Sequence, residues 1–257
     1  MQLSQLAVQL YTLRDHCKTA ADLAATAKKV RAIGYQAVQV SGVGPIPEAE
    51  IVAILRGEGL TLCATHESGQ NILDNTQMVI DRLHALGTQL TAYPYPNGID
   101  LSDGEQVNTL IRKLDIAGAK LREAGLTLGY HNHSLEFYRP GGGPSVLDRI
   151  YAETSPHNLV SELDTYWVQC GGGSPVEWVR RMSGRIPFIH LKDYRVDAHG
   201  TGSYAEIGAG QLPFAQIIAE AEAGGCKWFI VEQDTCPADP FDSLRQSFDY
   251  IKTHLIR

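Results

Sequence analysis

The sequence predicts a single α/β domain, residues 1–257, folded as a closed (β/α)8 barrel, and three observations support this prediction. Short apolar runs alternate with stretches of helical period, as in chains that form a parallel sheet with right-handed crossovers. This strand-then-helix unit repeats eight times in 257 residues, a length at which a barrel is commonly one domain. Several apolar runs end abruptly in Asp, His or Glu, as expected where strands deliver side chains to one rim.

The first half of the chain is predicted to alternate strands and helices. The strands span residues 6–10, 37–40, 60–64 and 89–92, and the helices span residues 20–33, 47–58, 72–86 and 105–124. Apolar residues recur at helical spacing, as Leu23, Ala27 and Val30 do in the first helix. A glycine follows each helix, which is a common way for a helix to end.

The second half is predicted to complete the set with strands at residues 126–130, 159–163, 188–191 and 228–231. Helices are expected at residues 145–153 and 212–223, and two more begin near Ser174 and Asp239. Ser174, Pro175 and Glu177 have the order of an N-cap, an N1 proline and the N3 acid of a capping box. A long loop is expected between residue 191 and Gly210.

An open doubly wound sheet is the alternative fold for the same alternation of elements. Such a sheet usually carries a Gly-x-Gly-x-x-Gly phosphate turn after its first strand. Here the corresponding segment, Gln9 to Arg14, reads QLYTLR. A dinucleotide crevice would lack its usual turn, so the closed barrel is preferred.

The chain carries 22 Lys and Arg against 29 Asp and Glu, a formal net charge of −7, and has no basic run. Nucleic-acid binding normally needs a surface that neutralises phosphates, so a small-molecule partner is expected and a nucleic acid is not. The first residues lack a basic region and a continuous apolar segment, and no stretch approaches the roughly 18 apolar residues of a membrane span. We expect no membrane association and a cytoplasmic location.

The cysteines are scattered and odd in number. They are Cys17, Cys63, Cys170, Cys226 and Cys236, with no Cys-x-x-Cys pair. Reduced thiols fit this pattern better than disulfides or a thiolate zinc site. Cys170 follows Asp164 closely, where a low-pKa nucleophile is one interpretation; a small, half-buried residue is the favoured one.

Ionisable side chains gather at the ends of the later strands, where a parallel barrel places its active site. Asp164, His190 and Glu232 each end a strand. Singly, such an acid is often a helix N-cap and such a histidine is often structural, but three on successive strands favour a joint site. Carboxylates and imidazoles without thiolates suit one divalent ion, Mn²⁺, Mg²⁺, Co²⁺ or Zn²⁺. The fourth ligand is expected from strand five, either Glu136 from the following loop or His131 at the strand end.

Further residues near the strand ends are candidates for contact with a substrate. Lys192 lies two residues beyond His190 with the same strand parity, which favours contact with a substrate oxygen over a solvated surface position. His66 and His133 are candidate binding residues, with structural hydrogen bonding as the alternative. Tyr11 and Trp167 are candidates for a wall against a sugar, although aromatic residues at strand ends are as often simple packing.

Five segments carry a resemblance that covers nearly the whole chain. They are VQLYTLR (8–14), GYHNHSLEF (129–137), LDTYWVQ (163–169), HLKD (190–193) and VEQD (231–234). Together they resemble the sugar phosphate isomerase/epimerase family of xylose-isomerase-like barrels. The resemblance implies a metal ion held by Glu, Asp, His and Glu from four strands, of which Asp164, His190 and Glu232 match the last three. The first Glu has no direct match, because that strand ends in His131 and the nearest glutamate is Glu136.

The resemblance implies a metal-dependent isomerase or epimerase of a sugar or keto-sugar, which is the leading expectation. A divalent ion that chelates adjacent carbonyl and hydroxyl oxygens stabilises the enediolate formed when a base removes the intervening proton. His131 or Glu232 is the expected base, and Lys192 is the third catalytic candidate. Epimerases of this type use two metal-bound carboxylates on opposite faces of the substrate. His131 in one of these places makes a lyase or dehydratase on a keto-sugar, keto-glycoside or inosose the main alternative.

Two other functional classes fit the sequence less well. An abasic-site endonuclease on the same barrel needs further metal ligands and a basic groove, and the net charge of −7 counts against it. A sugar-binding protein without catalytic activity needs no metal ion. Homo-oligomers are common among such barrels, although no interface stripe stands out in the sequence.

Overall fold

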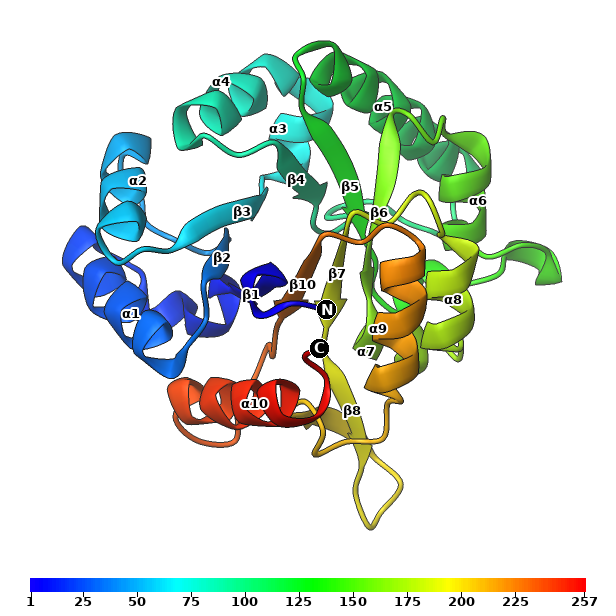
Figure 1. Ribbon diagram of the computed structural model, residues 1–257. Helices are drawn as coiled ribbons and strands as arrows, with labels where there is room; N and C mark the ends of the chain where they lie inside the picture. The colour runs from blue at the N-terminus through cyan, green and yellow to red at the C-terminus, as the bar shows by residue number, and fades with distance from the viewer.

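The computed structural model describes all residues from Met1 to Arg257 and contains a closed barrel of eight parallel strands. Around the barrel the strands follow in the order β1 (Leu6–Gln9), β10 (Trp228–Val231), β7 (Phe188–Leu191), β6 (Leu159–Asp164), β5 (Thr127–His131), β4 (Leu90–Tyr93), β3 (Thr61–His66) and β2 (Ala37–Val40). Figure 1 shows the helices as a ring outside the strands, with the two chain ends close together. The predicted fold and all eight predicted strands are confirmed.

The ring contains α1 (Ala20–Ile33), α2 (Glu48–Gly57), α3 (Gly69–Asp74), α4 (Thr76–Leu86), α5 (Gly104–Glu123), α6 (Val146–Glu153), α7 (Thr165–Cys170), α8 (Pro175–Arg181), α9 (Phe214–Ala223) and α10 (Pro240–His254). Four 3-10 turns, η1 (Leu3–Gln5), η2 (Leu10–His16), η3 (Leu135–Phe137) and η4 (Pro140–Gly142), lie in the connections. Ser174 caps α8 by accepting the N–H of Glu177 at 3.4 Å. The reciprocal bond that a capping box requires is absent, so only half of that prediction is correct.

Three local predictions were wrong or incomplete. The helix predicted at 72–86 is two helices, α3 and α4, which meet at Asn75, a residue with non-helical φ and ψ of −131° and 44°. The short helix α7 directly after β6 was not predicted. The long loop after β7 contains an antiparallel hairpin of β8 (Asp193–Val196) and β9 (Gly202–Ala205). The Asp193 carboxylate organises the end of this segment by accepting the N–H groups of Gly208 and Gly210, both at 3.0 Å.

Inside the barrel, side chains from alternate strand positions form layers. The lower layer is formed by Ala7, Ala37, Ala64, Ala92, Phe188 and Ile230, which belong with Cys63 to one small apolar cluster. Gly129 makes room for the Phe188 ring, which a Cβ at that position would overlap. Because side chains alternate along a strand, the next inward positions are two residues further on: Gln9, Gln39, His66, His131, His190 and Glu232. The small layer is therefore the floor beneath a polar layer.

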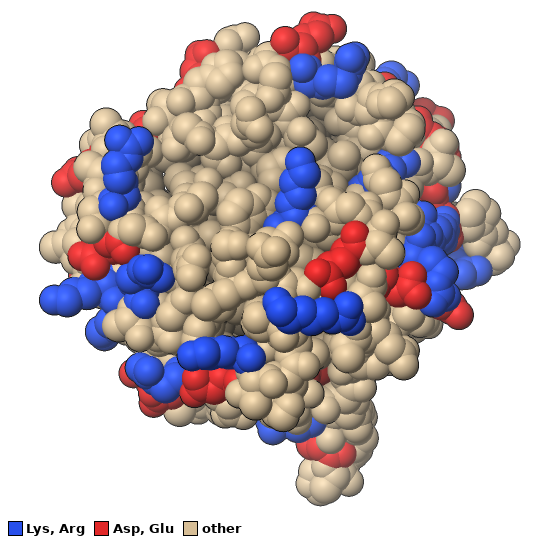
Figure 2. Space-filling model, in the orientation of Figure 1, with Lys and Arg blue, Asp and Glu red and all other residues tan.

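The surface carries charges of both signs. On the face shown in Figure 2, Lys and Arg lie in separate groups, some at the edge and some nearer the middle, and several of them are beside Asp or Glu. None of the helices combines the length and hydropathy needed to cross a lipid bilayer. The expectations about nucleic acid and location stay predictions.

Replacing Gly118 tests how closely α5 packs on the barrel. A Cβ at this position would overlap the backbone carbonyl of Asn158, just before β6. We expect Gly118→Ala to lower the free energy of unfolding by about 1–3 kcal/mol, as overpacking of a close contact does. Gly57→Ala is the matched control, because Gly57 is exposed, helical and has no atom within 4 Å of the added Cβ. It should leave stability unchanged or raise it by up to about 1 kcal/mol in denaturant unfolding. Equal losses in both variants would contradict the prediction.

Candidate metal centre

Asp164 ends β6 and is held by neighbours on both sides. Its backbone N–H donates to Asn132 Oδ1 at 3.0 Å. Its Oδ1 accepts the N–H of Trp167 at 2.9 Å, so Asp164 is indeed the N-cap of α7. The hydroxyl of Thr165 lies at the end of β7 and donates to the carbonyl of Lys192, the residue after this strand, at 2.8 Å. The second oxygen, Asp164 Oδ2, is buried and has no hydrogen-bond partner.

Two imidazoles face this oxygen. His190 on β7 lies opposite Asp164 in the strand register and places its Nδ1 3.9 Å from Asp164 Oδ2. His131 at the end of β5 places its Nε2 at the same distance from that oxygen. Both rings are buried, and their centroids are 4.6 Å apart. The two strands that flank β6 therefore each aim one imidazole at Asp164.

Glu232 closes the group from β10, the strand beyond β7. Its Oε2 lies 2.9 Å from His190 Nδ1 and 3.3 Å from Lys192 Nζ. Lys192 is only 1% exposed; its ammonium lies 3.5 Å from Asp164 Oδ2 and pairs with Asp234. Lys192 is therefore not a solvated surface residue, and its ammonium contacts carboxylates.

The buried ionisable groups of this cluster have pKa values shifted in different directions. Burial raises the pKa of Asp164 to about 7, with Lys192 opposing the shift and Glu232 adding to it. Burial alone would raise the pKa of Glu232 as well, but Lys192 and His190 outweigh it and hold that pKa well below its usual range. Burial opposes the charge on His190, yet Glu162 and Glu232 raise its pKa to about 10. Near neutral pH Asp164 thus competes for a proton, and a divalent cation can replace this proton.

The residues present fit a divalent ion. His131, Asp164, His190 and Glu232 offer one ligand atom each, and these atoms all lie within 4.8 Å of one another. Ligand atoms about 2.1 Å from a shared ion are spaced roughly 3–4 Å apart, so a small inward movement completes the set. Two imidazoles and two carboxylates suit Mn²⁺, Co²⁺, Zn²⁺ or Mg²⁺. The unpartnered Asp164 Oδ2 is a buried polar atom that such an ion would satisfy. These four residues are called the candidate metal centre.

Glu136, the other candidate for the fourth ligand, lies elsewhere. Its carboxylate accepts the Tyr130 hydroxyl at 3.0 Å and the backbone N–H of His133 at 2.8 Å. Burial raises its pKa to about 7. Tyr130 and His131 are successive residues of β5 and so face opposite sides of the barrel wall. The turn η3 places Glu136 on the Tyr130 side, and the structure brings His131, not Glu136, to the other three residues.

A cavity of about 370 Å³ opens onto the candidate metal centre. It is lined by His131, Glu232 and three of the predicted substrate residues, His66, His133 and Tyr11. The fourth, Trp167, does not line the cavity but packs with its ring centroid 5.0 Å from that of His133. His133 Nδ1 is buried without a partner. Burial, with His131 nearby, lowers the pKa of His133 to about 2, so its imidazole is neutral.

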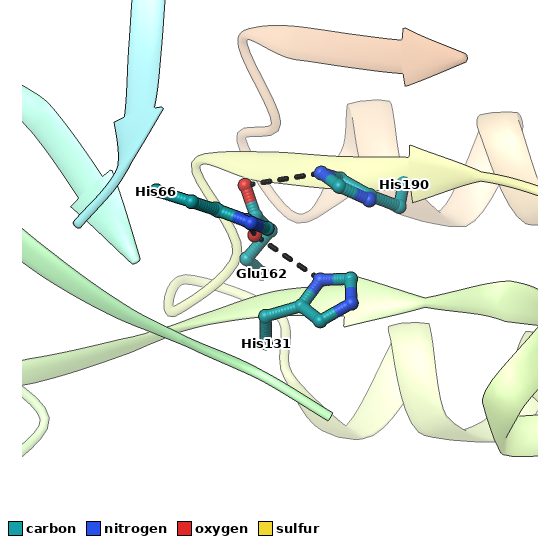
Figure 3. A group of neighbouring side chains, drawn as sticks. All are labelled: His66, His131, Glu162 and His190. Atoms are coloured by element: carbon teal, nitrogen blue, oxygen red, sulfur yellow. Dashed lines mark hydrogen bonds and ion pairs between the residues drawn. The ribbon is translucent and has the colours of Figure 1, made fainter. Parts of the chain in front are cut away.

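Sequence reasoning missed Glu162, a fully buried carboxylate below the centre. It accepts hydrogen bonds from Gln39 Nε2 at 2.7 Å and from His66 Nε2, and its Oε2 lies 3.2 Å from His131 Nδ1. Figure 3 shows this carboxylate between the three imidazoles. Burial alone would raise its pKa, but His190 and His66 outweigh burial and hold the pKa well below its usual range. The missed signal was strand parity, since Glu162 precedes Asp164 by two residues and shares its inward face.

Comparison with known proteins identifies the family. The model of the xylose isomerase-like TIM barrel family matches residues 27–254. The chain belongs to this family. The match extends from α1 to α10 and includes every residue of the candidate metal centre.

Individual proteins of known name or structure share only low sequence identity with this chain. An inosose dehydratase of Geobacillus kaustophilus is 32% identical over 171 residues, which cover 59% of this chain and 53% of the relative. The chain thus spans about half the length of such relatives. Among solved structures, a sugar phosphate isomerase/epimerase of Parabacteroides distasonis superposes with a TM-score of 0.82 at 20% identity, covering 98% of this chain and 95% of the other. A xylose isomerase-like barrel protein from Mycobacterium smegmatis, solved in complex with magnesium, superposes with a TM-score of 0.76 at 16% identity. The superposition covers 98% of this chain and 97% of the other. At these identities the structures show the shared fold alone.

Metal content distinguishes the two candidates for the fourth ligand. We expect His131→Ala and Asp164→Ala to weaken metal binding at least about tenfold, since each removes a proposed ligand. Glu136→Gln should keep the metal content of the unchanged protein, because its carboxylate lies on the other side of the β5 wall. Elemental analysis after mild purification and dialysis measures all three. Full metal content in Asp164→Ala, or its loss in Glu136→Gln alone, would contradict the proposed centre.

Proposed function

We propose that the protein is a divalent-metal-dependent carbon–oxygen lyase that acts on a polyhydroxylated ketone, such as a keto-sugar, a keto-glycoside or an inosose. One observation carries the proposal: a single carboxylate of the candidate metal centre, Glu232, faces the cavity. Asp164, the other carboxylate, caps α7 with one oxygen and is fully buried. The similarity to inosose dehydratases supports the same reaction class.

One carboxylate is sufficient for an elimination on one face of the substrate. Glu232 takes the proton from the carbon next to the ketone, and the electrons of this C–H bond form the new C=C bond as the β C–O bond breaks. The protonated Glu232 then gives the proton to the departing oxygen. Water, or an alcohol from a glycoside, leaves together with an unsaturated ketone, and Glu232 is again a carboxylate. A bound divalent ion would supply Lewis-acid polarisation of the ketone and its neighbouring hydroxyl.

The surrounding residues have defined parts in this scheme. Lys192 sits behind Glu232 and Asp164 and keeps Glu232 ionised, so that it starts the cycle as a base. His133 is neutral and lines the cavity, where its ring is suited to contact a substrate. His66 also lines the cavity, but its Nε2 is engaged by Glu162 and its Nδ1 lies 3.4 Å from the Gln9 amide. We assign His66 to positioning rather than proton transfer.

The cavity favours an uncharged substrate with room for a substituent. Neither Lys nor Arg lines it, whereas Glu67, Glu232 and Asp234 do, which disfavours a phosphate group. A second cavity of about 600 Å³ adjoins it and shares Ser68 and Tyr95 in its wall. Together they offer space beyond a single sugar ring, which supports a glycoside among the candidate substrates.

Epimerisation is the second candidate function, and the position of His131 favours it. Its imidazole and the Glu232 carboxylate reach the same centre from β5 and β10, which are separated by β6 and β7 around the barrel. If His131 does not bind the metal ion, the two side chains flank a substrate from different sides. Glu232 would then remove a proton and His131 would return one to the other face.

Incubation in D2O separates the two functions. A panel of inososes, keto-sugars and keto-glycosides is incubated with the Mn²⁺-loaded protein, and a sample treated with EDTA is the control. We expect an unsaturated ketone and released water or alcohol, detected by mass spectrometry and NMR. Any deuterium in the recovered substrate should be found at a carbon whose configuration has not changed. Deuterium at an inverted carbon, without elimination, would establish the epimerase instead.

Replacing Glu232 separates its role as base from metal binding. Glu232→Gln keeps an oxygen that can contact the ion but cannot take a proton. We expect turnover to fall about 10²–10⁴-fold, the usual contribution of a general base, with metal content largely kept. Steady-state kinetics and elemental analysis of the same preparation measure both. Asn108→Ala, a change on the outer helix α5, is the control and should match the unchanged protein. A Glu232→Gln variant with normal turnover would exclude Glu232 as the base.

A further inference from the structure

Glu162 touches no substrate cavity, yet it lies at the centre of a buried hydrogen-bond network that leads to the candidate metal centre. We propose that Glu162, acting through the side-chain amide of Gln39, is a positioning residue that sets which ring nitrogen of His190 keeps its hydrogen when a divalent ion binds. The other nitrogen would then offer its lone pair to the ion. This inference rests on the metal centre of the proposed function, not on the reaction catalysed there.

The first step is the polarity of the Glu162–Gln39 contact. Both residues are fully buried, on β6 and β2. A carboxylate offers only acceptors, so the group of Gln39 that faces it, 2.7 Å from Glu162 Oε1, must be the NH2. The backbone carbonyl of Thr65, at 3.5 Å from the same Nε2, is a second acceptor on this side. The amide of Gln39 therefore has one favourable orientation.

The second step follows from that orientation. With its NH2 toward Glu162, Gln39 presents Oε1 to His190 Nε2 at a distance of 2.7 Å. An amide oxygen only accepts, and Glu162 Oε1, 3.3 Å from the same nitrogen, is a second acceptor, so His190 Nε2 must carry the hydrogen. The reversed amide would set its NH2 against the ring N–H and its oxygen against the Glu162 carboxylate. Two favourable contacts would become two repulsive ones in a site where burial strengthens both effects.

The third step concerns the other ring nitrogen. A histidine that binds a metal carries one hydrogen, and the partner of that hydrogen fixes the tautomer. Here Nε2 keeps its hydrogen, and Nδ1, which faces the Glu232 carboxylate, would give up its hydrogen when a divalent ion binds and provide the lone pair. Nδ1 is also the nitrogen that lies 2.9 Å from Glu232 Oε2 and 3.9 Å from Asp164 Oδ2. The network from Glu162 through Gln39 thus presents the correct nitrogen of His190 to the centre.

An exchange of the two side chains tests the proposal. Glu162→Gln removes the group that orients Gln39, because two facing amides can pair in either direction. The double variant Glu162→Gln/Gln39→Glu restores an acceptor-only group beside His190 and a donor at position 162, with the same number of charges. Binding of Co²⁺ is titrated by its visible absorption, which also reports the ligand geometry. The His190 tautomer is read from ring ¹⁵N shifts of the zinc-loaded protein.

We expect Glu162→Gln to weaken Co²⁺ binding about 10–100-fold, as changes behind a metal-bound histidine typically do, and to alter the absorption band. The double variant should recover most of the affinity, the original band and the Nε2–H tautomer. Thr91→Val on β4 is the control, since it removes a buried hydroxyl bonded to Thr65 at 2.9 Å, away from the centre. It should lower thermal stability without changing the Co²⁺ band.

The outcomes that overturn the inference differ from those that overturn the proposed function. If the unchanged protein binds no Co²⁺, the metal centre itself fails. If it binds and Glu162→Gln binds equally well, or the double variant recovers nothing, Glu162 does not act through the Gln39 amide. If Glu162→Gln does not fold, the double variant alone decides. A folded double variant with binding more than about 100-fold weaker than the unchanged protein overturns the proposal.

Discussion

Burial of carboxylates inside the barrel is the constraint on which the rest of the site depends. Glu162 and Asp164 are fully buried, and an isolated charge in such a place costs several kcal/mol. The neighbouring strands offset this cost with groups that donate hydrogen bonds or carry positive charge: Gln39 and His190 for Glu162, Lys192 for Asp164. Removing one member changes the contacts of its neighbours, because they share these hydrogen bonds and ion pairs. The polar layer therefore behaves as one unit rather than as separate side chains.

The sequence was sufficient for the fold because its signals were local and repeated. Each strand is a short apolar run, each helix has an amphipathic period, and their alternation leaves little choice of topology. What it could not supply was long-range organisation. The hairpin of β8 and β9 depends on contacts such as those of Asp193 with Gly208 and Gly210, and no periodic sequence pattern predicts these contacts. The break at Asn75 interrupts a stretch whose apolar period continues across it.

For the site, the sequence identified residues whose place follows from strand ends. Asp164, His190 and Glu232 come together because β6, β7 and β10 are neighbours in the barrel. The choice between His131 and Glu136 depended on the path of the chain after β5, which η3 decides, and sequence alone left it open. The sequence did not assign a role to Glu162, because the position of an acidic residue within a strand can be interpreted only when the inward face of that strand is known.

In the proposed function, His131 in place of a carboxylate changes the electrostatics of the centre as well as its proton chemistry. With one Glu, one Asp and two neutral imidazoles, a divalent ion would be balanced to zero net charge. The Glu, Asp, His and Glu set implied by the family resemblance would instead give a net charge of −1. A neutral centre withdraws electrons from a bound ketone more strongly than an anionic one, which favours loss of the α-proton. It also leaves Glu232 as the only carboxylate of the centre that faces the cavity. In the proposed elimination both effects act in the same direction: the α-proton is lost more readily, and a second carboxylate that would return the proton to the opposite face is missing.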